Sequence, residues 1–133
     1  MEIFIGIVLA LAVSAFGTLV GFDRDRVFYP TILIVIALLY ALFAAIGGSF
    51  QAALVESPFI LIFVLASVLG FKFSLWLVVG GLAAHGVFDF IHRHLVTNPG
   101  VPKWWPMFCL TYDLTAAAYL AWLLRRTKAA PSL

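Results

Sequence analysis

Charged residues are scarce in this sequence, and cysteine is nearly absent. Lysine, arginine, aspartate and glutamate together make up 11% of the 133 residues, while 65% are hydrophobic. A soluble domain carries roughly 25% charged and about 45–50% apolar residues, so the composition excludes an ordinary soluble protein. The single cysteine, Cys109, excludes a disulfide within the chain and a metal cluster built on cysteines.

Several motifs of common activities are also missing. The chain has no glycine-rich phosphate loop and no Gly-x-Ser-x-Gly nucleophile elbow, so covalent catalysis has no support. The net charge of +2 is small, and the basic residues lie at the ends of apolar segments. They are therefore interpreted as topology signals, and no nucleic-acid partner is expected.

Long apolar stretches fill nearly the whole chain instead. Each is about 20 residues long, which is enough to cross a hydrocarbon core of roughly 30 Å as a helix. We predict a single all-α transmembrane domain over residues 1–133, a polytopic bundle of five helices at about 3–22, 30–47, 51–71, 73–95 and 105–124. Glu2 replaces the basic residues that begin a signal peptide, so the first helix is expected to be a retained span.

The basic residues predict how the bundle is oriented, because lysine and arginine in short loops favour the cytoplasmic side. With the N-terminus outside and the C-terminus inside, only Arg93 and Lys103 are outside. The cytoplasmic basic residues are then Arg24, Arg26, Lys72, Arg125, Arg126 and Lys128. We therefore expect an N-out, C-in, multi-pass protein of a bacterial inner (plasma) membrane.

The fourth predicted helix carries a stripe of polar side chains. His85, Asp89 and His92 follow one another at intervals of four and three residues, which places them within about 60° on one helix face. His94 points to roughly the opposite face. Charged groups inside a membrane span are expensive and mark functional sites by default, so this stripe is the first candidate site.

Two further carboxylates are expected at the level of this stripe. Glu56 lies near the start of the third helix, and Asp113 follows Cys109 by one turn in the fifth. Counting about 1.5 Å per residue from the expected outer ends places all of these side chains within about 15 Å of the outer surface. The sequence predicts one outward-opening pocket, framed by the third, fourth and fifth helices and covered by the loop at 98–106.

Structural interpretations compete with a functional one at each position. A membrane histidine beside an aspartate can be a plain hydrogen bond between helices, and Cys109 is expected to be a small packing residue. Arg93 and His94 are expected to contact solvent or lipid headgroups at the interface. The whole polar set at one depth favours a functional site.

The chemistry of this set favours a metal centre, because imidazole and carboxylate groups together suit zinc and iron ions. We predict that His85, Asp89 and His92 bind a divalent metal ion. Glu56 and Asp113 are the predicted catalytic residues, as further ligands or as general base to a metal-bound water. The expected function is a metal-dependent membrane enzyme, a hydrolase or oxidoreductase, that acts on an apolar or lipid-like substrate among the membrane lipids.

Two other functions fit the same residues. A row of protonatable side chains is also what a proton- or ion-coupled transporter or channel subunit needs. Because five spans make a small transporter, this alternative predicts a homo-oligomer, and Gly17-x-x-x-Gly21 in the first helix is a motif for close helix packing or dimerisation. The third possibility is a structural subunit of a membrane complex.

The C-terminal part of the chain resembles a family of small uncharacterised bacterial multi-pass membrane proteins, a domain of unknown function. The resemblance rests on an E...HxxxDxxH...NP...CxxxD pattern, formed here by Glu56, His85, Asp89, His92, Asn98-Pro99, Cys109 and Asp113. Where the family often has a histidine directly after the position of His92, this chain has Arg93. The resemblance implies a membrane fold of about five helices and the same polar set, and it carries no activity with it.

Overall fold

A computed structural model describes residues 1–128 of the chain. These residues form five α-helices and one short 3₁₀ helix, with no strand among them. The helices are α1 (Glu2–Val20), η1 (Phe22–Arg24), α2 (Phe28–Ile46), α3 (Phe50–Lys72), α4 (Trp76–Leu95) and α5 (Trp105–Lys128). The predicted all-α fold is confirmed, and each predicted helix end lies within about four residues of the observed one, as expected for sequence-based boundaries.

Four of the helices are long and apolar enough to cross a membrane. These are α1, α2, α3 and α5, the last over Trp105–Thr127. The exception is α4, whose polar stripe lowers its hydropathy. This helix is 20 residues long and buries its polar side chains against its neighbours, among them His85, Asp89 and His92. It therefore sits in the bundle through its packing partners more than through its own apolar surface.

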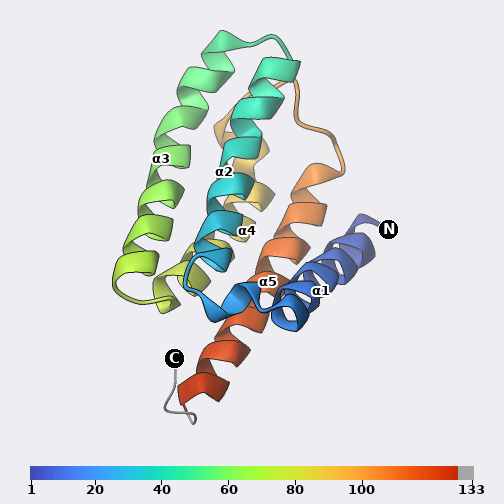
Figure 1. The fold of residues 1–133 in the computed structure, drawn as a ribbon. Coiled ribbons are helices and arrows are strands. Elements are labelled where there is room, and N and C mark those ends of the chain that lie inside the picture. The colour runs from blue at the N-terminus through green and yellow to red at the C-terminus, as the bar shows by residue number, and fades with distance from the viewer. Residues whose placement is uncertain (129–133) are drawn as a thin grey trace.

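Consecutive helices run in alternating directions, so the two termini lie at opposite ends of the bundle (Figure 1). The α4 helix packs against α5, α3 and α2, while α1 packs against α5. The turn between α2 and α3 and the loop between α4 and α5 lie at the same end, and η1 and the turn between α3 and α4 lie at the other (Figure 1). This topology places α4 at the centre of the helices that carry polar residues.

The ends of the helices have local causes. Gly21 closes α1 in the left-handed conformation, with φ of 95°, and its N–H donates to the carbonyl of Gly17 at 2.9 Å. Ser49 caps α3, because its hydroxyl oxygen accepts a hydrogen bond from the N–H of Ala52 at 3.0 Å. Pro30 lies in the first turn of α2, where a missing N–H costs nothing.

The glycines of α1 allow close packing against other parts of the same chain. The buried face of this helix consists of small residues, Gly6, Ala10, Ser14 and Gly17. A Cβ atom at Gly6 would collide with Thr111 on α5, and one at Gly17 would lie 2.7 Å from the ring of Phe28. Since Gly21 is used to end α1, the Gly17-x-x-x-Gly21 motif supports close packing inside one chain.

The loop between α4 and α5 folds back over the end of α2. Gly100 lies so close to the carbonyl of Phe43 that no Cβ atom would fit. The Asn98 side chain donates a hydrogen bond to the carbonyl of Tyr40 at 3.1 Å, and Trp105 packs edge-on against Phe43 with ring centroids 4.7 Å apart. These contacts hold the loop above the polar residues of α3 and α4.

Candidate polar site inside the bundle

The five predicted site residues all lie in the interior of the bundle. The side chains of Glu56, Asp89 and Asp113 are 0% exposed, His85 is 1% exposed and His92 is 3% exposed. His85 contacts Asp113 between α4 and α5, and His92 contacts Glu56 between α4 and α3. Their half of the bundle is the one that contains the turn between α2 and α3 (Figure 1).

His85 lies between two aspartates. Its Nδ1 atom is 2.8 Å from Oδ2 of Asp113 on α5 and 3.1 Å from Oδ2 of Asp89 one turn further along α4. One ligand atom from each of the three residues can be chosen so that all lie within 4.8 Å of one another. We call His85, Asp89 and Asp113 the His85 group.

The close approach of α4 and α5 beside this group depends on Gly86. A Cβ atom at this position would lie 3.2 Å from Cβ of Asp113 and 3.3 Å from the carbonyl oxygen of Leu110. Glycine therefore lets the backbone of α4 approach α5 where Asp113 projects toward His85. On the other side, the ring of Phe63 packs edge-on against the imidazole of His85, with centroids 4.6 Å apart.

Tyr40 on α2 completes the His85 group, and sequence reasoning missed it. Its hydroxyl donates a short hydrogen bond to Oδ1 of Asp89, and its side chain is 1% exposed. The available signal was a tyrosine inside an apolar run, because a buried tyrosine hydroxyl usually needs a partner. The site therefore involves α2 as well as the three helices that were predicted.

His92 belongs to a second set of contacts. Its Nε2 atom is 2.9 Å from Oε1 and 2.7 Å from Oε2 of Glu56, which lies on α3. The side chain of Asn98 donates to the same Oε2 atom at 2.8 Å. We call Glu56, His92 and Asn98 the Glu56 group. Sequence analysis placed Asn98 in a loop and in the resemblance pattern, but not among the site residues.

Tyr40 joins the two groups. Its ring stacks on the imidazole of His92, with centroids 4.0 Å apart and an interplanar angle of 17°, while its hydroxyl binds Asp89. The two groups therefore cannot rearrange independently, because a shift of the tyrosine ring would disturb both.

The hydrogen-bonding capacity of the two groups differs. Within residues 1–128, Nε2 of His85 and Oδ1 of Asp113 are buried without a hydrogen-bond partner. The Glu56 group has no such atom in the same part of the chain. Buried polar atoms without partners are rare and need an explanation, such as a functional role or a bound ion. Two of the four such atoms in the described part of the chain belong to the His85 group, and the other two lie on Tyr29 and Trp105.

The contacts among the five residues differ from those that the sequence predicted. His85 and Asp89 lie together as expected, but the third member of their group is Asp113, and His92 contacts Glu56. His94 is exposed and faces away from the site, as predicted. The expectation of an outward-opening pocket at these residues is wrong, because helix packing encloses all five side chains.

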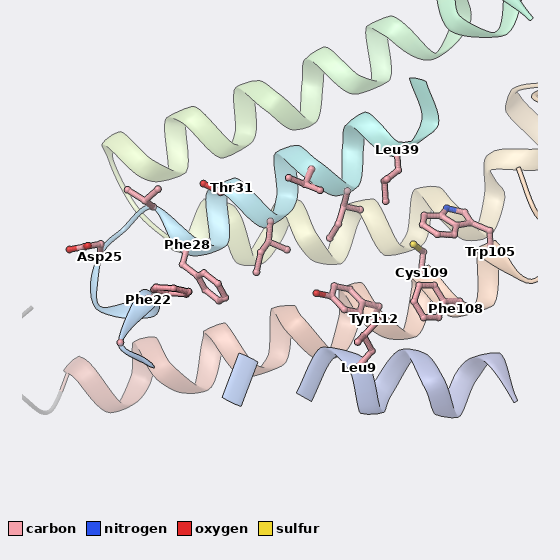
Figure 2. Close-up of a pocket in the computed structure, with 15 residues that line it drawn as sticks. Leu9, Phe22, Asp25, Phe28, Thr31, Leu39, Trp105, Phe108, Cys109 and Tyr112 are labelled. Carbon is pink, nitrogen blue, oxygen red and sulfur yellow. The ribbon is translucent and has the colours of Figure 1, made fainter. Parts of the chain in front are cut away.

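An apolar cavity, with Cys109 in its wall, lies beside the polar residues of the His85 group. It has a volume of about 600 Å³ and is lined by residues of α1, η1, α2 and α5. Figure 2 shows Trp105, Cys109 and Tyr112 of α5 facing this space from one side, with Leu39 on α2 opposite. Cys109 is buried, as a packing residue would be, and it precedes Asp113 by one helical turn. The cavity wall therefore adjoins the His85 group.

In comparisons with known proteins, no family model, no curated protein and no solved structure matches this chain.

Proposed function

We propose that the chain is a multi-pass protein of a bacterial inner membrane, oriented N-out and C-in, and that its His85 group binds a divalent zinc or iron ion. In this proposal Asp113 replaces His92 as the third ligand beside His85 and Asp89. The bound ion makes the protein a metal-dependent membrane enzyme, a hydrolase or oxidoreductase acting on an apolar or lipid-like substrate.

The observation that carries the proposal is one imidazole enclosed by two carboxylates at 0–1% exposure. With both carboxylates ionised and His85 neutral the group holds two negative charges, and protonation of the ring removes only one. Uncompensated charge inside a membrane protein is costly, and a divalent cation cancels both charges. The contacts of 2.8 and 3.1 Å are close to the roughly 3.4 Å that separates two ligands of a tetrahedral zinc ion.

The surrounding residues suit a metal centre. The hydroxyl of Tyr40 holds Oδ1 of Asp89, as outer hydrogen bonds commonly orient metal-binding carboxylates. A metal ion would supply Lewis acidity and lower the pKa of a bound water. Glu56 is linked to the His85 group through His92 and the ring of Tyr40, and it is the proposed general base. His92 positions it through the two contacts of 2.9 and 2.7 Å.

The position of the apolar cavity next to Cys109 supports a lipid-like substrate. The 600 Å³ cavity is lined mainly by apolar side chains of membrane-spanning helices, and Cys109 at its wall is one turn from Asp113. We infer that the substrate enters from the lipid side, with its apolar part in this cavity. Access to the metal would require movement at Cys109.

Metal analysis of the purified protein tests the proposal. We expect elemental mass spectrometry to find about one zinc or iron ion per chain. The variants His85→Ala and Asp113→Ala should lose that ion. His94→Ala is the matched control, because His94 lies on the same helix and is exposed. A folded wild-type protein that stays free of metal after incubation with zinc or iron would overturn the proposal.

A second candidate function is a proton- or ion-coupled transporter or channel subunit. The row of contacts from Asp113 through His85 and Asp89 to Tyr40 favours it, because linked protonatable groups can pass a proton. Proteoliposomes would then show a proton flux that is lost in Asp113→Asn. A structural subunit, the third candidate, predicts neither bound metal nor flux.

We also propose kinship with the small bacterial multi-pass proteins whose pattern this chain resembles. The pattern residues Glu56, His85, Asp89, His92 and Asp113 are the ones buried together here, which gives a physical reason for a shared pattern.

A further inference from the structure

A second cavity lies at the end of the bundle opposite the Glu56 group. Its volume is about 520 Å³, and it is bounded by η1, the start of α2, the turn between α3 and α4 and the last turns of α5. A cavity of this size is large enough to hold a small ligand. The residues used below are Arg24, Arg126, Asp23, Tyr29 and Leu120, all of which line it.

Arginine outnumbers aspartate on the rim of this cavity, with Arg24, Arg26 and Arg126 against Asp23 and Asp25. Arg24 and Arg126 are exposed, and within residues 1–128 neither forms an ion pair with a carboxylate. The guanidinium of Arg126 stacks over the ring of Trp122, with its central carbon 4.8 Å from the ring centroid. Asp23 is already engaged, because it accepts a hydrogen bond from the Thr18 hydroxyl at 2.5 Å. Two guanidinium groups are therefore available to an anion.

A third arginine supports the rim without being available. The guanidinium of Arg26 donates to the carbonyls of Phe71 at 2.9 Å and Gly70 at 3.1 Å. These carbonyls belong to the last turn of α3, where helices favour a positive charge. Arg26 thus ties the segment before α2 to the end of α3 and holds one wall of the cavity in place.

The floor of the cavity is apolar apart from one group. Tyr29 and Leu120 are buried at 3% and 2% exposure. This one polar group, the hydroxyl of Tyr29, is itself buried and is not exposed to the cavity. A site with cations at the rim and an apolar floor matches a ligand that is itself amphipathic.

We propose that this cavity binds the headgroup of an anionic phospholipid, with the phosphate at Arg24 and Arg126. Guanidinium groups bind phosphate with two parallel hydrogen bonds, and basic pockets between membrane helices on the cytoplasmic side bind anionic headgroups. The cavity lies where membrane helices end, at the level that headgroups occupy. Free phosphate shares the anionic chemistry, but it would make no use of the apolar floor.

Native mass spectrometry of the full chain in detergent tests this site. The protein is mixed with equal amounts of phosphatidylglycerol and phosphatidylcholine, and the retained lipids are counted. We expect phosphatidylglycerol to be preferred, and the double variant Arg24→Gln/Arg126→Gln to reduce that preference about tenfold or more. Arg93→Gln/Lys103→Gln is the matched control, because these exposed residues lie near the opposite end of the bundle and should leave the preference unchanged.

A competition experiment distinguishes a lipid headgroup from free phosphate as the bound anion. Inorganic phosphate at millimolar concentration should not displace the lipid. Equal retention of both lipids, displacement by inorganic phosphate, or full selectivity in the double arginine variant would overturn the proposal. None of these results depends on metal at the His85 group.

Discussion

The two histidines that α4 contributes to the interior have the same kind of partner but different surroundings. In the Glu56 group, one imidazole meets one carboxylate, and Asn98 supplies a further hydrogen bond. In the His85 group, one imidazole meets two carboxylates, and two polar atoms are without a partner in the described part of the chain. If every carboxylate is ionised and both rings are protonated, the first arrangement is balanced in charge and the second carries one excess negative charge.

This difference assigns ligand binding to the His85 group alone, while Glu56 is the proposed general base and its pairing with His92 also stabilises the fold. A balanced, hydrogen-bonded pair between helices is sufficient as a structural contact, and its cost is limited because each charge has a partner. An excess of buried negative charge calls for a cation. The predictions below separate structural effects at Glu56 from ligand binding at His85, and they run from the largest expected effect to the smallest.

Glu56→Ala should cause the largest loss of folding stability. It leaves the buried His92 without its carboxylate, and breaking a buried pair costs about 3–5 kcal/mol. The free energy of unfolding in mixed detergent, followed by circular dichroism, measures the effect. Glu2→Ala, at the partly exposed start of α1, is the control and should change little. A loss equal to that of the control would show that the pair does not stabilise the fold.

Asp113→Asn should instead act on metal binding. It removes one of the two negative charges near His85, and we expect metal affinity to fall about 100-fold, which corresponds to about 2.7 kcal/mol. Competition with a chromophoric chelator measures the affinity. Without metal the variant should unfold no more easily than the wild type, because two carboxylates no longer repel each other. Unchanged metal affinity would contradict the assignment of Asp113 as a ligand.

Tyr40→Phe tests the residue that both groups share. The variant loses the hydroxyl that binds Asp89 but keeps the ring that stacks on His92. Removing such an outer hydrogen bond typically lowers metal affinity about 10–100-fold. The same chelator competition gives the value, and Tyr119→Phe serves as the control, because Tyr119 is half-buried in the C-terminal half of α5, away from the His85 group. If the variant binds metal as tightly as the wild type, Tyr40 does not support the metal centre.

Asn98→Ala should have the smallest effect. It removes the hydrogen bonds to Glu56 and to the carbonyl of Tyr40, and hydrogen bonds inside membrane proteins contribute about 0.6 kcal/mol on average, with a maximum near 1.7. Stability should fall within this range while metal affinity stays close to that of the wild type. A large drop in metal affinity would mean that the two groups are more tightly coupled than the charge comparison indicates.

The sequence alone was sufficient for the helices and for the polar stripe. A run of about 20 apolar residues has few alternatives to a membrane helix, and the intervals between His85, Asp89 and His92 place them on one face of any α-helix. Matching levels for Glu56 and Asp113 followed from counting residues along antiparallel helices. These are local properties, set by helix geometry and chain length.

Only the tertiary structure decided which polar groups meet. Whether Asp113 or His92 is the closer partner of His85 depends on how α5 is rotated and how closely it approaches α4 at Gly86. Tyr40 and Asn98 joined the site because α2 and the loop before α5 pack over it. Such contacts depend on the rotation and spacing of helices, and the pattern within a single helix does not contain that information.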